Sequence, residues 1–140
     1  MREGLEVGLL ADPPAEFRGG LGQRINAFHS ASVPFEAVRF GLEVTRGGVL
    51  VAGLSGVMSW GWLFVEALWV DAALRGQGVG RELMARAEAH ALASGCHGAW
   101  LDSFQAVGFY QALGYARFGA LEDYPAGQTR VFLRKSLRAV

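Results

Sequence analysis

The spacing of apolar residues changes repeatedly along the first half of the chain. A short apolar run from Leu5 to Leu10 predicts a first strand. Asp12-Pro13-Pro14 can cap and begin a helix, and apolar residues then recur at helical spacing, which predicts an amphipathic helix. The residues that form this apolar stripe are Phe17, Leu21, Ile25 and Phe28.

From Phe35 onward, apolar and polar residues alternate, as in a strand with one exposed face. Gly47-Gly48 then predicts a hairpin turn. The segments Val49 to Met58 and Trp62 to Val70 are more apolar, and Ser59-Trp60-Gly61 between them is a second turn signal. Three successive strands joined by short turns predict an antiparallel meander.

The second half of the chain alternates between helical and strand patterns. Its first helix begins near Gly80 and ends at Ser94-Gly95, and its apolar stripe consists of Leu83, Met84, Ala87 and Ala91. A strand is predicted over 98–104, a short helix over 106–113, and two last strands over 115–121 and 128–136. The order β-α-β-β-β-α-β-α-β-β predicts an α+β fold with a mixed, mostly antiparallel sheet of about seven strands flanked by helices. A chain of 140 residues suits a single domain, residues 1–140.

Composition and charge exclude several classes of function. The 13 basic and 13 acidic residues balance and are scattered, so a nucleic-acid partner is not expected. Cys96 is the only cysteine, which excludes a disulfide framework and a cysteine-based zinc site and favours the reducing cytoplasm. The N-terminus does not resemble a signal peptide, and glycines, serines and Glu66 interrupt the most apolar stretch. A soluble cytoplasmic protein without a membrane partner is therefore expected.

A strand, a glycine-rich loop and a helix follow one another between Val70 and Leu83, with glycine at positions 76, 78 and 80. Glycine lets successive backbone amides turn toward a ligand without a Cβ in between. The first N–H groups of the helix have no internal partners, and the helix dipole favours negative charge there. The loop therefore predicts a phosphate site, and a turn without a ligand is the simpler alternative.

Two other phosphate-binding loops match this stretch poorly. The Walker loop requires a lysine followed by a serine or threonine, and neither is present. The dinucleotide-binding fingerprint Gly-x-Gly-x-x-Gly has a different spacing and belongs to a parallel βαβ unit rather than to a meander. A nucleotide-binding oxidoreductase stays open as a third interpretation, behind the two given below.

Two motifs carry a resemblance to a known family. The stretch Arg75-Gly76-Gln77-Gly78-Val79-Gly80 resembles the Arg/Gln-x-x-Gly-x-Gly/Ala motif of the GNAT superfamily of N-acetyltransferases. The stretch Ala106 to Tyr115 resembles the aromatic-tyrosine helix of the same superfamily, which Leu-Gly-Tyr or Leu-Gly-Phe follows. The resemblance covers Leu63 to Leu137 and is to bacterial members whose acceptors are generally unassigned.

The resemblance implies that acetyl-CoA is the co-substrate and that no metal is needed. The loop amides would bind the coenzyme A pyrophosphate. The fourth and fifth strands would splay apart, and the pantetheine arm would pair with the freed backbone of the fourth. Ser103 stands where many members have an asparagine. The residues implied to contact the co-substrate are Leu68, Val70, Arg75, Gly76, Gln77, Gly78, Val79, Gly80, Arg81 and Ser103.

The resemblance also implies two catalytic residues, each with a structural alternative. Tyr110 matches the tyrosine that can protonate the sulfur of coenzyme A, and the alternative is a packed tyrosine whose hydroxyl bonds a backbone carbonyl. Glu66 lies where some members have an acid that deprotonates the amine, often through water. A carboxylate in so apolar a strand needs a partner, and the alternative is an ion pair with an arginine such as Arg39. The backbone N–H of Val70 would polarise the thioester carbonyl.

Together these patterns predict an acetyl-CoA-dependent N-acetyltransferase that acts directly on a primary amine of a small molecule, a lysine side chain or an N-terminus. The alternative is a non-catalytic coenzyme A-binding module of the same fold. Asp102 could bind a cationic acceptor or make a buried structural hydrogen bond. Glu122, Asp123 and Tyr124 could attract an amine or solvate a turn. A homodimer that forms through a sheet edge is compatible with the pattern, which does not identify the surface.

Overall fold

The computed structural model describes residues 3–30 and 37–138 of the chain. Its contacts separate an N-terminal unit that ends at Phe35 from a larger unit that begins at Glu36. The predicted start of a strand at Phe35 lies outside the described residues. No helix in the two described ranges has the length and apolar character that spanning a bilayer requires.

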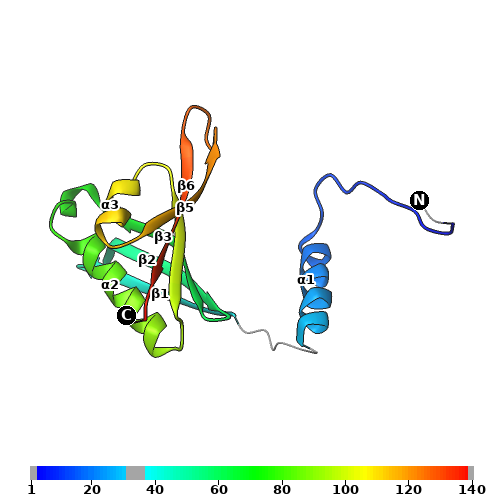
Figure 1. Ribbon diagram of the computed structural model, residues 1–140, viewed down its shortest axis with the longest axis horizontal. Helices are drawn as coiled ribbons and strands as arrows, with labels where there is room; N and C mark the ends of the chain where they lie inside the picture. Colours follow the sequence, from blue (N-terminus) through cyan, green and yellow to red (C-terminus); the bar gives the residue numbers. More distant parts are fainter. Residues whose placement is uncertain (1–2, 31–36, 139–140) are drawn as a thin grey trace. The chain divides into compact units, whose positions relative to one another are not determined.

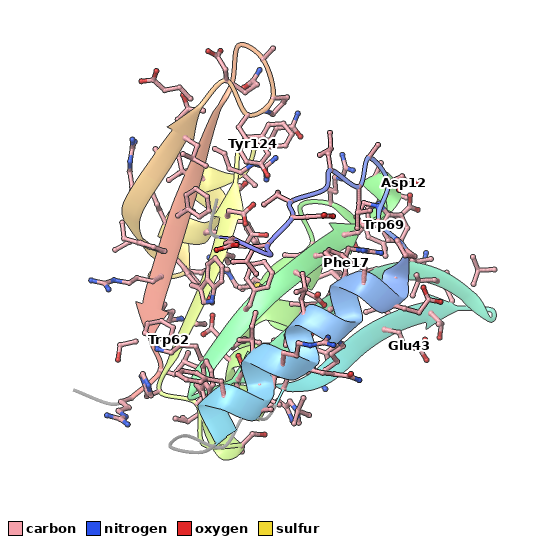
Figure 2. All side chains as sticks on the ribbon, turned by 90° about the vertical axis from the view of Figure 1, so that its right-hand side faces the viewer. Asp12, Phe17, Glu43, Trp62, Trp69 and Tyr124 are labelled. Atoms are coloured by element: carbon pink, nitrogen blue, oxygen red, sulfur yellow. The ribbon has the colours of Figure 1, made fainter. Side chains whose placement is uncertain are left out.

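The N-terminal unit contains helix α1 (Ala15–Ser30), as the apolar spacing predicts. Phe17 projects from its first turn (Figure 2). The predicted strand from Leu5 to Leu10 is wrong, because this segment has no regular structure. Val7 and Leu9 are 78% and 94% exposed, and a strand needs a neighbour whose backbone completes its hydrogen bonds. Apolar character alone therefore does not make this segment a strand.

The larger unit contains a mixed sheet of six strands in the order β1-β2-β3-β4-β6-β5 (Figure 1). Its strands are β1 (Ala37–Arg46), β2 (Val49–Ser59), β3 (Trp62–Val70), β4 (Gly98–Ser103), β5 (Ala116–Glu122) and β6 (Thr129–Ser136). Among the described strands, β3 and β4 alone pair in parallel. The sheet confirms the predicted α+β class and the antiparallel meander. It has one strand fewer than expected, because residues 5–10 pair with no described strand.

Helix α2 (Val79–Ala93) lies across β2 and β3, and a shorter helix, α3 (Val107–Ala112), follows β4 (Figure 1). The predicted apolar stripe of α2 is buried against the inward-facing positions of the sheet. The largest fully buried side chains of the core are Leu63, Met84, Leu101 and Leu133. This core holds in place the ends of β3 and β4 and the N-terminus of α2.

Strands β3 and β4 form a fork, defined here as the gap where they part after a short paired end. They pair over three positions only, Trp62 with Gly98, Leu63 with Ala99, and Phe64 with Trp100. The rings of Phe64 and Trp100 stack at the last of these paired positions, with centroids 4.3 Å apart. Beyond them β3 bonds only to β2, and β4 bonds only to β6. The predicted splay of these two strands is therefore confirmed.

A partly buried polar cluster joins α2 to β6 and to Tyr115, which precedes β5. Glu88 on α2 accepts hydrogen bonds from the Tyr115 hydroxyl at 2.9 Å and from Lys135 Nζ at 2.7 Å. The side chains of Lys135 and Glu88 are 28% and 14% exposed, so neither charge is well solvated. Loss of either partner would leave an unpaired charge in this poorly solvated position.

We expect Glu88→Gln to lower the free energy of unfolding by on the order of 2 kcal/mol, because it leaves Lys135 without a charged partner. Urea denaturation of the variant measures this loss. Glu82→Gln is the matched control, since Glu82 pairs with Arg86 at 65% and 69% exposure and such pairs contribute about 0–1 kcal/mol. Equal midpoints for the two variants would contradict a structural role for the Glu88 cluster.

Candidate active site

The glycine-rich loop presents uncapped backbone N–H groups at the start of α2. It follows β3 through a single 3₁₀ turn at Ala72–Leu74. Gly76 and Gly78 have φ values of 78° and 82°, which favour glycine. Gly78 is the N-cap of α2, and no side chain of the described residues caps the N-terminus of this helix. The loop therefore has the donor geometry that suits an anionic group.

Two side chains of the loop are turned back onto its own backbone. Arg75 Nε donates to the carbonyl oxygen of Val70 at 3.2 Å. Gln77 Nε2 donates to the carbonyl oxygen of Ala73 at 3.2 Å. These bonds stabilise the path of the loop, and the Nη1 and Nη2 groups of Arg75 stay available to an anion beside the backbone N–H groups.

The backbone of β3 faces the fork at Leu68 and Val70. The N–H of Asp71 donates to the carbonyl oxygen of Val51 on β2 at 2.9 Å. Because backbone groups alternate sides along a strand, the N–H and C=O groups of Leu68 and Val70 point away from β2. An extended chain in the fork could pair with them as a further strand does, although the Val70 carbonyl oxygen already accepts one hydrogen bond from Arg75.

A cavity of about 650 Å³ opens over the loop and the end of β3; we call it the donor cavity. Gly80 is in close contact there, since a Cβ built on it would lie 3.3 Å from the Phe109 ring. Among the predicted co-substrate contacts, the donor cavity is lined by Leu68, Val70, Arg75, Gly76, Gly78, Val79, Gly80 and Arg81. Gln77 is not among its lining residues.

A second cavity of about 230 Å³ lies in the fork, and we call it the acceptor cavity. Glu66 and Ser103, which are absent from the donor cavity, line it. Four residues line both cavities, namely Leu68, Gln105, Ala106 and Tyr110. The two cavities therefore meet where β3 approaches α3.

Tyr110 lies at this junction with its ring packed and its hydroxyl unengaged. The ring is in edge contact with those of Phe109 and Tyr115, with centroids 5.0 and 6.0 Å away. Within the described part of the chain the hydroxyl makes no hydrogen bond, so the backbone-capped alternative is not observed. Burial, and to a lesser extent the charge of Asp102, raises the pKa of Tyr110. The hydroxyl therefore stays protonated at neutral pH and can donate its proton or a hydrogen bond.

Glu66 occupies an irregular position of β3. Ser55 pairs with Ala67 and Gly56 pairs with Val65, so Glu66 is the extra residue of a β-bulge. Its Oε2 accepts a hydrogen bond from Arg39 Nη1 at 2.8 Å, which is the ion pair foreseen as the structural alternative. The two side chains are 32% and 72% exposed, and a pair so exposed contributes about 0–1 kcal/mol. The pair therefore holds Glu66 only weakly, and the carboxylate also lines the acceptor cavity.

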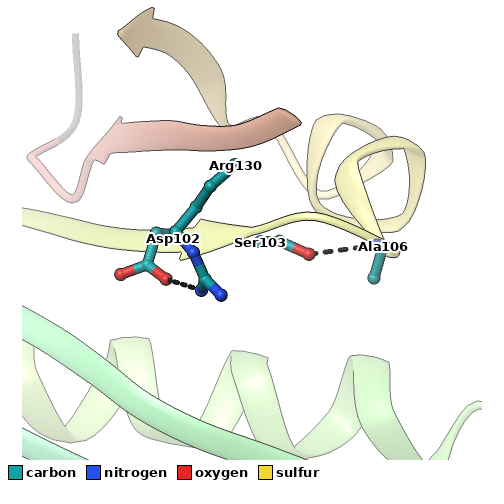
Figure 3. Close-up of polar contacts among 4 residues, drawn as sticks. All are labelled: Asp102, Ser103, Ala106 and Arg130. Carbon is teal, nitrogen blue, oxygen red and sulfur yellow. Dashed lines mark hydrogen bonds and ion pairs between the residues drawn. The ribbon is translucent and has the colours of Figure 1, made fainter. Parts of the chain in front are cut away.

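Ser103 and Asp102, at the end of β4, accept hydrogen bonds from different parts of the chain (Figure 3). Ser103 Oγ accepts a hydrogen bond from the Ala106 N–H at 3.0 Å, next to the start of α3. Asp102 Oδ1 accepts one from Arg130 Nη1 on β6 at 2.7 Å. Asp102 is thus partly neutralised, which corresponds to the structural alternative for this residue.

Sequence reasoning singled out neither Arg130 nor Gln105, and both line the acceptor cavity. Arg130 is separated from Asp102 by 28 positions, so no local pattern reports their contact. The one available signal is an arginine at a strand position next to a core residue, Val131. At the tip of the adjacent hairpin, Asp123 Oδ1 accepts a hydrogen bond from the Gly127 N–H, which matches a turn role for Asp123.

Other reactive groups in the described ranges do not extend the site. Cys96 is buried, and burial raises the pKa of its thiol, which fits a packed residue rather than a nucleophile. No three histidine, cysteine, aspartate or glutamate side chains in these ranges gather as metal ligands.

Comparison with known proteins finds a family and several proteins that this chain resembles. Residues 11–115 match the acetyltransferase (GNAT) family. The blasticidin-S acetyltransferase of Streptomyces morookaense is 48% identical over 93 residues, which cover 64% of this chain and 68% of that protein. A crystal structure of an acetyltransferase from Bacillus cereus matches with a TM-score of 0.82 and 26% identity, and the match covers 92% of this chain and 97% of the Bacillus chain. An aminoglycoside 6'-N-acetyltransferase complexed with coenzyme A shares the fold, with a TM-score of 0.65 and 16% identity. This match covers 73% of this chain and 74% of the aminoglycoside enzyme's chain.

Proposed function

This chain belongs to the acetyltransferase (GNAT) family, and we propose that it transfers the acetyl group of acetyl-CoA directly to a primary amine of a small molecule. The observation that carries the proposal is the meeting of the donor and acceptor cavities at Leu68 and Tyr110. One similar protein acts, by its name, on the small molecule blasticidin-S, and a protein of the same fold has been crystallised with coenzyme A. We further propose that the whole chain, residues 1–140, works as one acetyltransferase domain.

The donor cavity fits acetyl-CoA by the chemistry of its lining groups. The N–H groups at the start of α2 would bind the pyrophosphate, helped by the helix dipole. The freed backbone of Leu68 and Val70 would pair with the amide groups of the pantetheine arm. This arrangement directs the thioester toward the junction of the two cavities, and the Val70 N–H would polarise its carbonyl.

The residues at the junction supply the two proton movements that acetyl transfer requires. Glu66 would take a proton from the amine, directly or through water, so that the nitrogen can form the new C–N bond. As the C–S bond breaks, the Tyr110 hydroxyl would donate a hydrogen bond and then its proton to the sulfur. The products are an acetylated amine and free coenzyme A. Glu66 then releases the proton it took to solvent, and the Tyr110 phenolate regains one, so both side chains return to their starting states.

Thermal melting and thiol release test this proposal together. Acetyl-CoA at about a hundred times its dissociation constant adds roughly 2.7 kcal/mol to stability, which a melt detects. We expect acetyl-CoA and coenzyme A, but not NAD or ATP, to raise the melting temperature, and a panel of primary amines to cause release of coenzyme A. Binding without transfer to any amine or peptide would support the non-catalytic module, and stabilisation by NAD alone would support an oxidoreductase.

Gly78→Ala tests the loop, because the added Cβ would stand among the proposed pyrophosphate donors. We expect about a tenfold weaker binding of acetyl-CoA by calorimetry, which corresponds to about 1.4 kcal/mol. Gly47→Ala is the matched control, since Gly47 also has a positive φ, 59°, and has no atom within 4 Å of a built Cβ. Both variants strain the backbone, so an equal loss of binding in both would contradict the assignment of the loop.

A further inference from the structure

Arg130 is the one arginine in the lining of the acceptor cavity, within the described residues. Its guanidinium lies against two aromatic rings, 4.2 Å from the centroid of Tyr124 and 5.1 Å from that of Phe104. Tyr124 belongs to the connection between β5 and β6 (Figure 2), and Phe104 follows β4. The rings hold the plane of the guanidinium in place, and such planar groups favour paired contacts with carboxylates.

The hydrogen-bonding capacity of Arg130 is largely unused. A guanidinium carries five N–H donors. Among the described residues only Asp102 bonds it, through Nη1 at 2.7 Å (Figure 3). Its Nε is buried and has no hydrogen-bond partner in residues 3–30 and 37–138. The side chain is 21% exposed, so a group in the cavity can reach it.

The charges around the acceptor cavity are already balanced in pairs. Arg39 neutralises Glu66, and Arg130 neutralises Asp102. An acceptor with a cationic amine alone would compete with an arginine for either carboxylate. An acceptor that also carries an anion would give Arg130 a second partner as its ammonium approaches Glu66 or Asp102, so both charges would be matched.

The geometry points to an acceptor that bears a carboxylate as well as its primary amine, with Arg130 as the residue that binds the carboxylate. This inference rests on the proposed function and specifies the acceptor class within it. Arg130 acts on affinity and orientation, and it takes no part in the proton transfers. Its effect should therefore appear mainly in KM for the acceptor rather than in kcat.

A structural role is the competing explanation, in which Arg130 only ties the β5–β6 connection to β4. A panel of primary amines separates the two explanations if each amine is supplied both as its carboxylate and as its carboxamide, for example phenylalanine and 3-amino-3-phenylpropanoate with their amides. Kinetics with acetyl-CoA give kcat and KM for each. Saturation-transfer NMR on the coenzyme A-loaded chain measures acceptor binding without requiring transfer.

We expect the carboxylate forms to have at least tenfold higher kcat/KM than their amides, and Arg130→Gln to abolish this preference by raising KM for the carboxylates alone. Arg130→Lys, which keeps the positive charge but not the planar guanidinium, should retain part of the preference. Arg134→Gln is the matched control, since Arg134 lies on the same strand, stacks 5.7 Å from the Phe118 ring and does not line the cavity.

Equal kcat/KM for carboxylates and amides in the wild type would overturn the inference. An equal loss of kcat/KM for both forms in Arg130→Gln would overturn it as well. Neither result would contradict acetyl transfer itself. If no acceptor is acetylated, the proposed function fails, and the NMR experiment decides the inference separately. Carboxylate binding that disappears in Arg130→Gln would support it, and the absence of carboxylate binding to the loaded chain would overturn it.

Discussion

We expect Tyr110→Phe to lower kcat for acetyl transfer by about a hundredfold or more, which is the usual contribution of a positioned proton donor. The phenylalanine keeps the ring contacts with Phe109 and Tyr115 and removes only the hydroxyl, which makes no hydrogen bond within the described residues. Steady-state kinetics with a fixed amine measure the change. Calorimetric binding of acetyl-CoA should be unaltered.

The pH dependence of this reaction follows from the environment of Tyr110. Burial and the charge of Asp102 raise its pKa above the ordinary value of 10, so the protonated hydroxyl persists to higher pH than in a free tyrosine. Activity should therefore show no alkaline decline from this residue below about pH 10. Tyr115→Phe is the contrasting variant, because it removes the bond to Glu88 and should reduce stability rather than kcat. Full activity in Tyr110→Phe would remove Tyr110 from the mechanism.

We expect Glu66→Gln to lower kcat/KM for the amine about a hundredfold near neutral pH, because the amide cannot accept the proton of the attacking nitrogen. The loss should shrink as the pH approaches the pKa of the acceptor amine, since more of the amine is then already neutral. A pH–rate profile of the variant against the wild type measures both effects. Acetyl-CoA binding should not change, because Glu66 does not line the donor cavity.

Arg39→Gln is the control that separates the two interpretations of Glu66. It breaks the 2.8 Å ion pair and keeps the carboxylate. If Glu66 serves only this pair, the two variants should lose the same activity and the same stability. We expect Arg39→Gln to retain most of the activity, and an equal loss in both variants would argue against Glu66 as the base.

The features that the sequence predicts well are those that neighbouring residues determine. The hairpin at Gly47-Gly48 has two positive φ values, 59° and 79°, as its glycines indicate. The glycine loop leads into α2 at Gly78, and α2 buries the predicted stripe. In each case the signal is a periodicity or a backbone conformation that a few adjacent residues specify.

The features that the sequence does not predict depend on distant partners. Leu5 to Leu10 has the apolar character of a strand, but it has no paired neighbour in the structure. The bulge at Glu66 depends on its register with Ser55 and Gly56, which composition does not reveal. Arg130 enters the site only because β6 lies beside β4. Glu66 and Asp102 stand out in the sequence by their own chemistry, whereas the place of Arg130 beside them follows only from the pairing of β4 with β6.

This difference in construction bears on how such a chain can change during evolution. The proposed donor cavity depends largely on main-chain N–H and C=O groups, which most substitutions elsewhere leave in place. The acceptor cavity depends on side chains from three strands, namely Glu66, Asp102 and Arg130. We therefore expect single substitutions of Asp102 or Arg130 to alter the accepted amine while the acetyl donor stays the same.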